Sequence, residues 1–533
     1  MKDIAWSPVP REARPAERAR RARRSSHASR LFFWGVLLCG CSRHSGGPAR
    51  EPPPARPAHV AARLGTHIPS QTGKERLAFQ ARIDPDLKRI EVELCPSGFR
   101  IERLNAPSPG AERLLEGGAI ITPRAALACP GEGVDVPDSK PDECLHYVVN
   151  LPEKSHDPTS LRRAGADALV SPDLWLWVPS PRPVGVVMQL SLTLPDGLVA
   201  LLPWPATLPE TAFAWKSAGA FSHTPPTPLL VPGAELSVAA LGDGFGQHAS
   251  VVRDWIAQGA RASSLLFGQF PVPHALVIAV PGDRSGPGFG MALRGGGPAV
   301  VIFLDRHASA ASLVNDWTAT HEFLHLGVPR LPPEDAWLFE GLASYYTEVV
   351  RARAGIISPA QAYQHLLEGF GRGKRNEGSL SLRDESSQMH ERHSFFRVYW
   401  AGAALAFLTD VEARRASGPT LDAALRSFAE CCAASEDDWT AQRVLAYLDQ
   451  SMGAPRFSEH ARRWLDRREF PELDDALRTL GVAPGSRGEA IFGPAPNAAI
   501  RDAIMAPSAL SSSARGAGKS SPPEPQSEPH RRE

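Results

Sequence analysis

The chain has 533 residues, which is too many for one ordinary hydrophobic core and predicts two or three domains. Its 43% hydrophobic and 22% charged residues are typical of a globular protein. Lysine plus arginine equals aspartate plus glutamate at 58 each, so the formal net charge is zero. This balance gives no indication of a nucleic-acid-binding surface, which needs a basic stripe.

The N-terminal segment has the features of a targeting sequence. A basic run, Arg11 to Arg30, stands directly before the apolar stretch LFFWGVLLCGCS. Its apolar part, Leu31 to Leu38, is too short to cross a bilayer as a helix. The following LCGC resembles a bacterial lipobox, in which Cys41 would be lipidated and become the mature N-terminus. We therefore expect a lipid anchor and a place in a bacterial cell envelope, at the periplasmic or outer-membrane face. The alternatives are a plain cleaved signal and a buried apolar strand.

The next segments predict a tether and then a β domain. Residues 42–77 are rich in proline, alanine and arginine, which is typical of a flexible tether. From 78 to 205, short stretches such as RIEVELCP and LWLWVPSP alternate β-branched or aromatic residues with others and end at Pro or Gly. LPDG is a hairpin-type turn. We expect an all-β, sandwich-like domain here.

The cysteines outside the leader fall into two groups. An oxidising compartment would permit one disulfide among Cys95, Cys129 and Cys144 and leave one free thiol. The adjacent Cys431 and Cys432 are expected to contribute to helix packing. No Cys-x-x-Cys pair occurs, so a cysteine-ligated zinc site is not expected.

The sequence period changes from about residue 236. HASVVRDWIAQGARASSLLFG has apolar residues at helical spacing, whereas HALVIAVP and AVVIFLD are short buried strands. Between them lies a glycine-rich loop, Gly282 to Gly297, which lacks the G-K-[ST] of a phosphate loop. The chain from Ser312 to about Leu480 is predicted to be mostly helical. The last residues lack large apolar side chains and predict a disordered tail.

The stretch SLVNDWTATHEFLHLG predicts a helix that carries two metal ligands. It ends at Gly327, with a proline shortly beyond. His321 and His325 are four residues apart, so they lie on one face of the helix and can chelate one zinc ion. Glu322 lies about 100° around the helix, where it can reach a water at the metal but cannot be a ligand. The alternative is an ordinary amphipathic helix.

A catalytic zinc site needs a third protein ligand. LPPEDAWLFEGLASYYTEVVRARAG predicts a second helix, joined to the first by a link short enough for antiparallel packing. Glu340 lies midway along it, and the adjacent Gly341 allows close helix approach. Glu334 and Glu348 are rival ligands, one too near the helix start and the other too far along. The number, spacing and placement of ligands favour zinc.

HEFLH followed by WLFEGLASYY resembles the gluzincin metallopeptidases, in particular the glycyl aminopeptidase family and its relatives around aminopeptidase N. The segment from Val398 to Phe428 resembles a later segment of these families, in which Tyr399 aligns with their tyrosine. The resemblance implies an α+β multidomain fold, with an N-terminal β domain, a thermolysin-like α/β catalytic domain and a helical C-terminal part. The expected divisions are a leader at 1–41, a tether at 42–77, the β domain at 78–205, the catalytic domain at 206–355, the helical part at 356–482 and a disordered tail at 483–533.

These residues together predict zinc-dependent peptide hydrolysis. His321, His325 and Glu340 would hold Zn²⁺, Glu322 would act as the general base, and Tyr399 would donate to the tetrahedral intermediate. The expected partners are a peptide or protein substrate and the membrane, through the lipid anchor. A catalytically silent binding or scaffold lipoprotein is the alternative, and a non-peptide hydrolase is a third class. The intact Glu322 argues against a silent protein.

The glycine-rich loop departs from the pattern that the resemblance implies. In aminopeptidases a strand-edge glycine motif carries a glutamate that holds the free amine of the substrate. The matching stretch here is GFGMALRGGG, with Asp283 before it and Arg294 within it. Arg294 would repel an ammonium group and attract a substrate carboxylate or carbonyl. We expect weak selection of the amine, and either endopeptidase-like cleavage or a narrow substrate, unless a carboxylate from the helical part reaches across.

Overall fold

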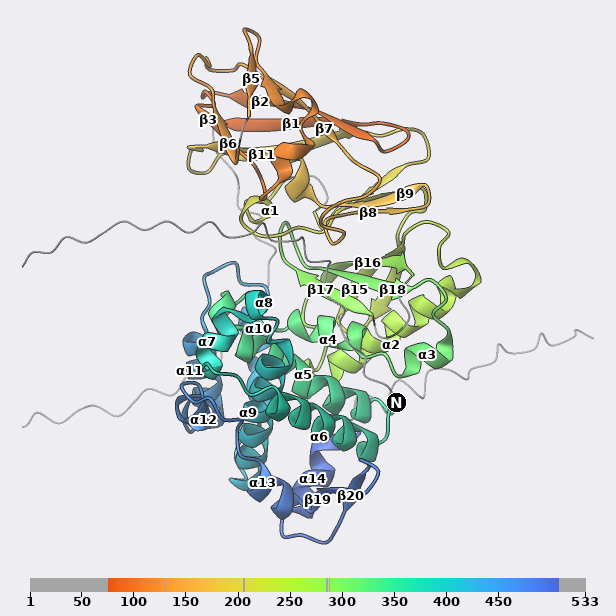
Figure 1. The fold of residues 1–533 in the computed structure, drawn as a ribbon, viewed down its shortest axis with the longest axis vertical. Coiled ribbons are helices and arrows are strands. Elements are labelled where there is room, and N and C mark those ends of the chain that lie inside the picture. The colour runs from red at the N-terminus through yellow and green to blue at the C-terminus, as the bar shows by residue number, and fades with distance from the viewer. Residues whose placement is uncertain (1–74, 130, 205–206, 284–285, 287, 508–533) are drawn as a thin grey trace, which may run out of the picture. The chain divides into compact units, whose positions relative to one another are not determined.

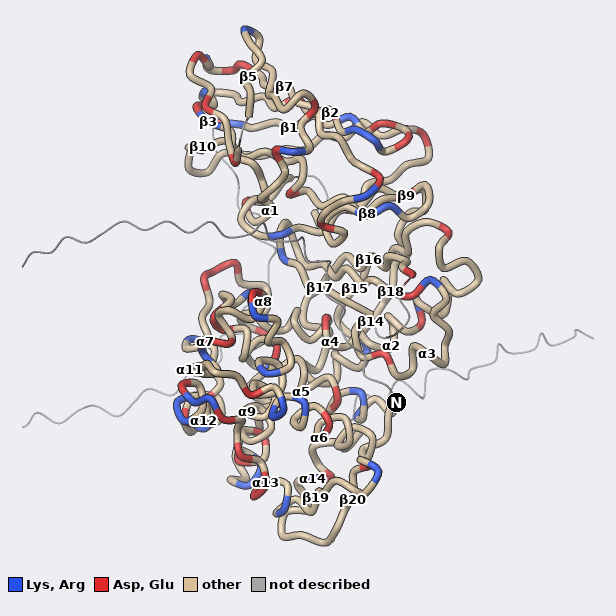
Figure 2. Tube along the Cα trace, viewed as in Figure 1, with Lys and Arg blue, Asp and Glu red and all other residues tan. Residues whose placement is uncertain are grey.

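The computed structural model describes residues 75–129, 131–204, 207–283, 286 and 288–507 (Figure 1). The predicted leader with its lipidation site Cys41, and all but the last three residues of the predicted tether, lie outside the described residues. None of the described helices has the length and apolar character needed to cross a membrane. Positive and negative side chains are interspersed along the described chain (Figure 2).

Three antiparallel or mixed sheets make up the N-terminal part. The largest has the strand order β11-β1-β2-β7-β4-β5, in which only β1 and β11 run parallel. Alternate residues of β1 and β2 are buried, which is the period-two pattern of strands with one face on a core. The strands of the first sheet are β1 (Arg76–Ile83), β2 (Arg89–Ser97), β4 (Ala119–Ile121), β5 (Ala126–Ala128), β7 (Leu145–Asn150) and β11 (Val187–Thr193).

The two smaller sheets complete this β region. One has the order β10-β3-β6, and the other has the order β12-β13-β9-β8. Strand β13 lies beyond residue 205, so the β structure continues past the predicted domain end. The strands are β3 (Arg103–Asn105), β6 (Gly133–Asp135), β10 (Val178–Ser180), β8 (Leu161–Ala164), β9 (Asp167–Val170), β12 (Val199–Leu201) and β13 (Ala220–Ser222), and a short helix α1 (Thr211–Ala214) precedes β13.

The cysteines of the β region form one disulfide. Cys95, on β2, is bonded to Cys144, which directly precedes the paired strand β7, and Cys129 is a buried free thiol. This arrangement agrees with the expected single bridge and one free thiol. The helical pair differs from expectation, because Cys431 and Cys432 are bonded to each other at the end of a helix instead of only packing there.

A five-stranded sheet with the order β14-β15-β16-β18-β17 follows. The inner strands β15, β16 and β18 are parallel, and the edge strands β14 and β17 are antiparallel to their neighbours. Strand β17 falls inside the stretch that the sequence predicted to be a loop, because five of its residues pair with β18. The strands are β14 (Thr227–Val231), β15 (Ala234–Ala240), β16 (His274–Gly282), β17 (Phe289–Leu293) and β18 (Ala299–Asp305).

The helix that was expected to begin at Ser312 is divided in two. Helix α3 (Ala310–Val314) ends before Asn315, and helix α4 (Thr318–His325) begins three residues later. The prediction of one continuous helix was wrong because Asp316 accepts hydrogen bonds from the amides of Thr318 and of the distant Gly288. Helix α4 packs between α2 (Ala249–Phe267), α5 (Ala336–Arg353) and the edge strand β17 (Figure 1).

The helical part is built around the contact between α5 and α9 (Phe395–Arg415). A Cβ on Gly402 would clash with the carbonyl oxygen of Trp337, and one on Gly341 would clash with the backbone of Gly402. The two helices therefore meet backbone to backbone. The surrounding helices are α6 (Pro359–Arg375), α7 (Leu382–Ser387), α8 (Met389–Arg392), α10 (Leu421–Cys432), α11 (Ala441–Met452), α12 (Arg456–Trp464) and α13 (Asp474–Leu480).

The start of the predicted disordered tail is folded. Strands β19 (Val482–Pro484) and β20 (Ala490–Phe492) pair, and helix α14 (Ala498–Met505) follows. Ile504 and Met505 are buried in the helical core, and the carbonyl oxygen of Ile504 accepts a hydrogen bond from Arg353. The prediction of disorder from residue 483 was therefore wrong for residues 483–507, because a few apolar residues dock on a core formed by distant helices.

Candidate metal centre

Three side chains from two helices bring their donor atoms together. His321 and His325 come from α4, and Glu340 comes from α5. The distances are 3.2 Å between the two Nε2 atoms, 3.3 Å from His321 Nε2 to Glu340 Oε2, and 3.4 Å from His325 Nε2 to the same oxygen. The two imidazoles are almost fully buried, and the carboxylate is 15% exposed. The predicted ligands thus form one nearly equilateral triangle.

This triangle has the size that zinc requires. Zinc bonds of about 2.0–2.1 Å in a tetrahedron place neighbouring ligand atoms about 3.3 Å apart. Two imidazole nitrogens and one carboxylate oxygen are a ligand set of catalytic zinc sites, which leave one position open. His321, His325 and Glu340 therefore form a group that can bind zinc, as the sequence predicted.

Neighbouring groups fix the orientation of the two imidazoles. The Nδ1 atom of His321 lies 3.4 Å from the hydroxyl of Thr347, which itself donates to the carbonyl oxygen of Ala343. This hydroxyl is therefore placed to accept the Nδ1 proton, so that Nε2 is left to face the metal. The ring of Phe339 stacks on His325 with centroids 4.1 Å apart. The sequence interpretation missed Thr347, although it lies seven residues after Glu340 on the same helical face.

Glu322 lies beside the triangle, against the edge strand β17. A Cβ on Gly290 would clash with the Glu322 side chain, so a glycine is needed there, and Ala292 gives the Glu322 carboxylate a backbone hydrogen bond. Burial raises the pKa of Glu322 to about 7, with His321 opposing and Glu340 reinforcing the shift. A carboxyl group with a pKa near neutrality can both accept and return a proton.

The Glu340 carboxyl stays ionised. Burial alone would raise its pKa, but the charge of His325 and hydrogen bonds from His321 and His325 outweigh burial, so the pKa lies below its ordinary value. An ionised carboxylate is the form that binds a cation.

Tyr399 lies at the same centre. Its ring is stacked against that of His321, with centroids 6.1 Å apart, and its hydroxyl forms a hydrogen bond with Glu340. Burial raises the pKa of Tyr399, and the charges of Glu340 and Glu322 add to the effect. The hydroxyl therefore keeps its proton at neutral pH and can act as a donor. Tyr399 lies in the second turn of α9, and α9 packs against α5, the helix that carries Glu340.

The two rival ligands lie elsewhere. Glu334 is exposed in the short 3-10 turn that precedes α5. The carboxylate of Glu348 is buried and lies 2.8 Å from His365 Nδ1 and 3.4 Å from an Arg351 nitrogen. Neither glutamate belongs to the triangle, so the sequence choice of Glu340 agrees with the geometry.

Asp283 and Arg294 of the glycine-rich stretch each have a partner within the protein. Asp283 is mostly exposed and pairs with Arg306 at 2.8 Å. Arg294 donates to the backbone carbonyl oxygens of His325 and Val328, among others, so its guanidinium is used inside the protein instead of facing substrate. Burial lowers the pKa of Arg294 to about 10, and the group is still a cation at neutral pH. The expectation of a substrate-facing arginine was wrong, because the guanidinium group donates its hydrogen bonds to backbone carbonyl oxygens of the protein.

Comparison with known proteins agrees with this centre. Residues 330–403 match the family model of the M61 glycyl aminopeptidases, and this segment contains Glu340 and Tyr399. Among curated proteins, no sequence matches the chain.

Solved structures share the architecture at low sequence identity. An aminopeptidase N family protein from Idiomarina loihiensis superposes with a TM-score of 0.61 and 15% identity, over 76% of this chain and 78% of that chain. An M1 zinc metallopeptidase from Deinococcus radiodurans gives a TM-score of 0.47 and 13% identity, over 75% and 94% of the two chains. The fold assignment rests on the first of these.

These findings confirm the predicted fold class, with its N-terminal sheets and helical C-terminal part, and the family match supports a peptidase with an aminopeptidase-like fold. The chain therefore has the architecture of the aminopeptidase N family and resembles, through the segment that bears Glu340 and Tyr399, the M61 glycyl aminopeptidases.

Proposed function

We propose that this protein is a zinc-dependent metallopeptidase in which Glu322 is the general base and Tyr399 the oxyanion donor. The observation that carries the proposal is the triangle of His321, His325 and Glu340, with a buried carboxyl group of raised pKa directly beside it. Zinc bound there would lower the pKa of a water molecule toward about 7 and polarise a peptide carbonyl.

Glu322 and Tyr399 are assigned the proton transfer and the stabilisation of the developing negative charge. Glu322 accepts a proton from the attacking water and passes it to the leaving amine. Tyr399 keeps its proton and donates a hydrogen bond to the oxygen that becomes negative, a contribution worth roughly 10²–10³ in rate. The edge strand β17, on which Gly290 and Ala292 flank Glu322, closes one side of the base and limits its access to water.

We also propose that the protein is a lipoprotein of a bacterial cell envelope, anchored through Cys41. The support is the basic run, the short apolar stretch and the lipobox-like LCGC of the sequence. Cys41→Ser is expected to move the protein from the membrane fraction to the soluble fraction. A wild-type protein that is already in the soluble fraction, with its N-terminus elsewhere, would remove this part of the proposal.

A catalytically silent binding lipoprotein is the competing function. It is not favoured, because binding alone has no need of a buried base at the centre. The two functions differ in one experiment, which incubates the purified protein with a mixed peptide library and sequences the products. The proposal predicts cleavage that stops when a chelator removes zinc and returns when about one equivalent is restored. Zinc binding without any cleavage would identify the silent protein instead.

A further inference from the structure

Gly288, the residue before the edge strand β17, is hydrogen-bonded to the start of α4, the helix that carries His321 and His325. The Gly288 amide donates to one oxygen of Asp316 at 2.7 Å, and the other oxygen accepts the Thr318 amide of α4 at 2.8 Å. The Thr318 hydroxyl returns a hydrogen bond to the Gly288 carbonyl at 3.1 Å. These bonds fix the register of the strand against the first turn of α4, where it borders Glu322.

Arg294, the residue directly after β17, ties the strand to the opposite end of α4. One guanidinium nitrogen lies 3.1, 3.0 and 2.7 Å from the carbonyl oxygens of His325, Leu326 and Val328, and the other lies 2.7 Å from that of Ala433. The last carbonyls of a helix have no partner within it, and a cation there also interacts favourably with the helix dipole. Arg294 thus binds the backbone of His325, whose side chain belongs to the triangle.

The turn behind Arg294 rests on the β region. The Gly295 amide donates to the Lys216 carbonyl at 3.0 Å. A Cβ on Gly296 would clash with the ring of Trp204, and a Cβ on Gly297 would lie 2.8 Å from the Pro203 carbonyl oxygen. Because these three residues have no Cβ, the β region packs directly against their backbone. The backbone at Arg294 is therefore held in place.

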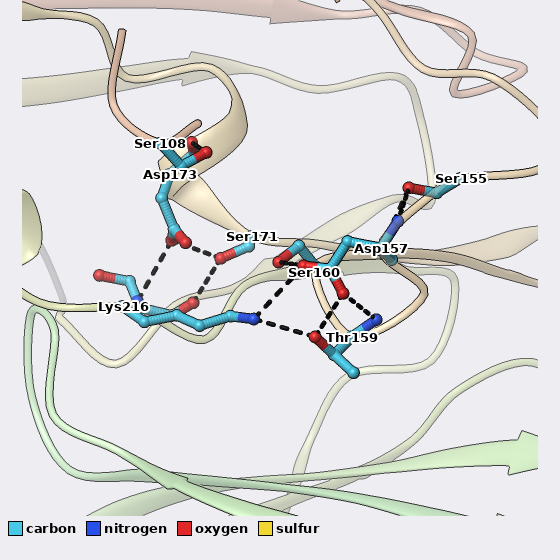
Figure 3. Close-up of polar contacts among 9 residues, drawn as sticks. Ser108, Ser155, Asp157, Thr159, Ser160, Ser171, Asp173 and Lys216 are labelled. Atoms are coloured by element: carbon cyan, nitrogen blue, oxygen red, sulfur yellow. Dashed lines mark hydrogen bonds and ion pairs between the residues drawn. The ribbon is translucent and has the colours of Figure 1, made fainter. Parts of the chain in front are cut away.

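Side chains of the β region bind the segment at Lys216, whose carbonyl oxygen accepts the Gly295 amide (Figure 3). Asp173 accepts the Ser217 amide at 3.2 Å. The Lys216 ammonium lies 3.0 Å from the Thr159 hydroxyl and 3.6 Å from Asp157. The backbone at Lys216, which holds the turn after Arg294, is therefore itself held by hydrogen bonds. Arg294 connects this turn to the C-terminal end of α4.

We propose that Arg294 is a positioning residue for the metal centre, which holds the backbone of His325 against the C-terminal end of β17. The proposal rests on zinc binding at the triangle, which is part of the proposed function. It goes beyond that function because it assigns the ligand geometry and zinc affinity of the site to a residue that contacts neither metal nor substrate.

A purely structural role for Arg294 makes a different prediction, and the chain offers a matched control. Arg163, in the β region, also donates from one guanidinium nitrogen to backbone carbonyl oxygens, those of Leu87 at 2.7 Å and Leu151 at 2.9 Å. Methionine at either position removes the same kind of hydrogen bonds. Both variants are expected to lower the thermal midpoint, but only the change at Arg294 touches α4.

The experiment compares wild type, Arg294→Met and Arg163→Met by chelator competition for zinc and by the visible absorption of the cobalt-substituted protein, which reports ligand geometry. Arg294→Met is expected to bind zinc at least about tenfold more weakly, as happens when supports of metal ligands are removed, and to change the cobalt spectrum. Arg163→Met is expected to keep the wild-type affinity and spectrum.

Wild-type affinity and an unchanged spectrum in Arg294→Met would overturn the proposal, and so would equal changes in Arg163→Met. If Arg294→Met does not fold, Arg294→Lys decides by the same measurements. Lysine keeps the charge but not the planar fork, so weakened zinc binding is again expected and wild-type affinity again contradicts the proposal. Peptide hydrolysis is not used, so a wild type that binds zinc and cuts nothing would refute the proposed function alone. A wild type that binds no zinc would refute both.

Discussion

Glu340 supplies the third donor atom of a triangle in which the two imidazoles alone would hold zinc poorly. Glu340→Ala is therefore expected to lower zinc affinity sharply. Glu348→Ala, about two turns further along the same helix, is the matched control, because its carboxylate is bonded to His365 and Arg351. Metal content and chelator competition measure both. Zinc loss in the Glu348 variant with retention in the Glu340 variant would reverse the assignment.

Thr347 determines which nitrogen of His321 faces the metal. Thr347→Val keeps the shape of the side chain but removes the hydroxyl, so we expect zinc affinity to fall by roughly tenfold. Thr347→Ser keeps the hydroxyl and is expected to bind zinc nearly as wild type does. Equal affinities in the valine and serine variants, measured by chelator competition, would show that the hydroxyl has no such role.

At the scale of single residues, local spacing was enough to predict His321, Glu322 and His325, because their relation is set by one helical turn. The roles of Thr347 and Arg294 could not be predicted in the same way. Their partners are 26 or more residues away along the chain, on other elements. The sequence interpretation gave Arg294 a substrate-facing role because composition shows a charge but does not show which backbone carbonyls will surround it.

At the scale of elements, the contact between α5 and α9 brings Glu340 and Tyr399 to the same centre. Gly402→Ala is expected to destabilise the fold by about 1–3 kcal/mol or more, since the added methyl group would clash with the Trp337 carbonyl. Gly418→Ala is the control, because a Cβ there meets nothing within 4 Å. The free energy of unfolding in urea compares the two. Equal stabilities would show that α5 and α9 can separate without cost.

The element boundaries show where sequence patterns succeed. The second helix was expected within LPPEDAWLFEGLASYYTEVVRARAG, and α5 spans Ala336–Arg353, because the prolines before it and the glycine after it are local end signals. The break before α4 was missed, since it depends on the carboxylate of Asp316 bonding the distant Gly288. The edge strand β17 was missed for a similar reason, because its glycine-rich sequence pairs only in the presence of β18.

At the scale of the whole molecule, the arrangement bears on which peptides are cut. Asp283, the one acidic residue of the stretch Gly282–Gly297, is mostly exposed and pairs with Arg306 at 2.8 Å, so it is not placed to hold a substrate amine. We therefore retain the expectation of weak selection for a free N-terminus. A peptide and its N-acetylated form are expected to differ in kcat/KM by less than a hundredfold. A larger preference for the free peptide, equivalent to ~2.7 kcal/mol in transition-state binding, would reveal an amine anchor.

The extent of the folded chain was predicted only in part. The N-terminal sheets and the helical C-terminal part follow from periodicities that each segment carries by itself. The folding of residues 483–507 does not, because Ile504 and Met505 are buried only against helices that come from much earlier in the chain. A segment poor in large apolar residues can still fold by docking on a core that other helices have formed.

The most direct measurement compares zinc content and peptide hydrolysis in wild type, Glu322→Gln and the control Glu348→Gln. Glu322 borders the triangle without belonging to it, so Glu322→Gln is expected to keep about one zinc per chain and to lose turnover. Glu348→Gln is expected to keep both. Wild-type turnover in Glu322→Gln would contradict a mechanism in which this carboxylate moves the proton.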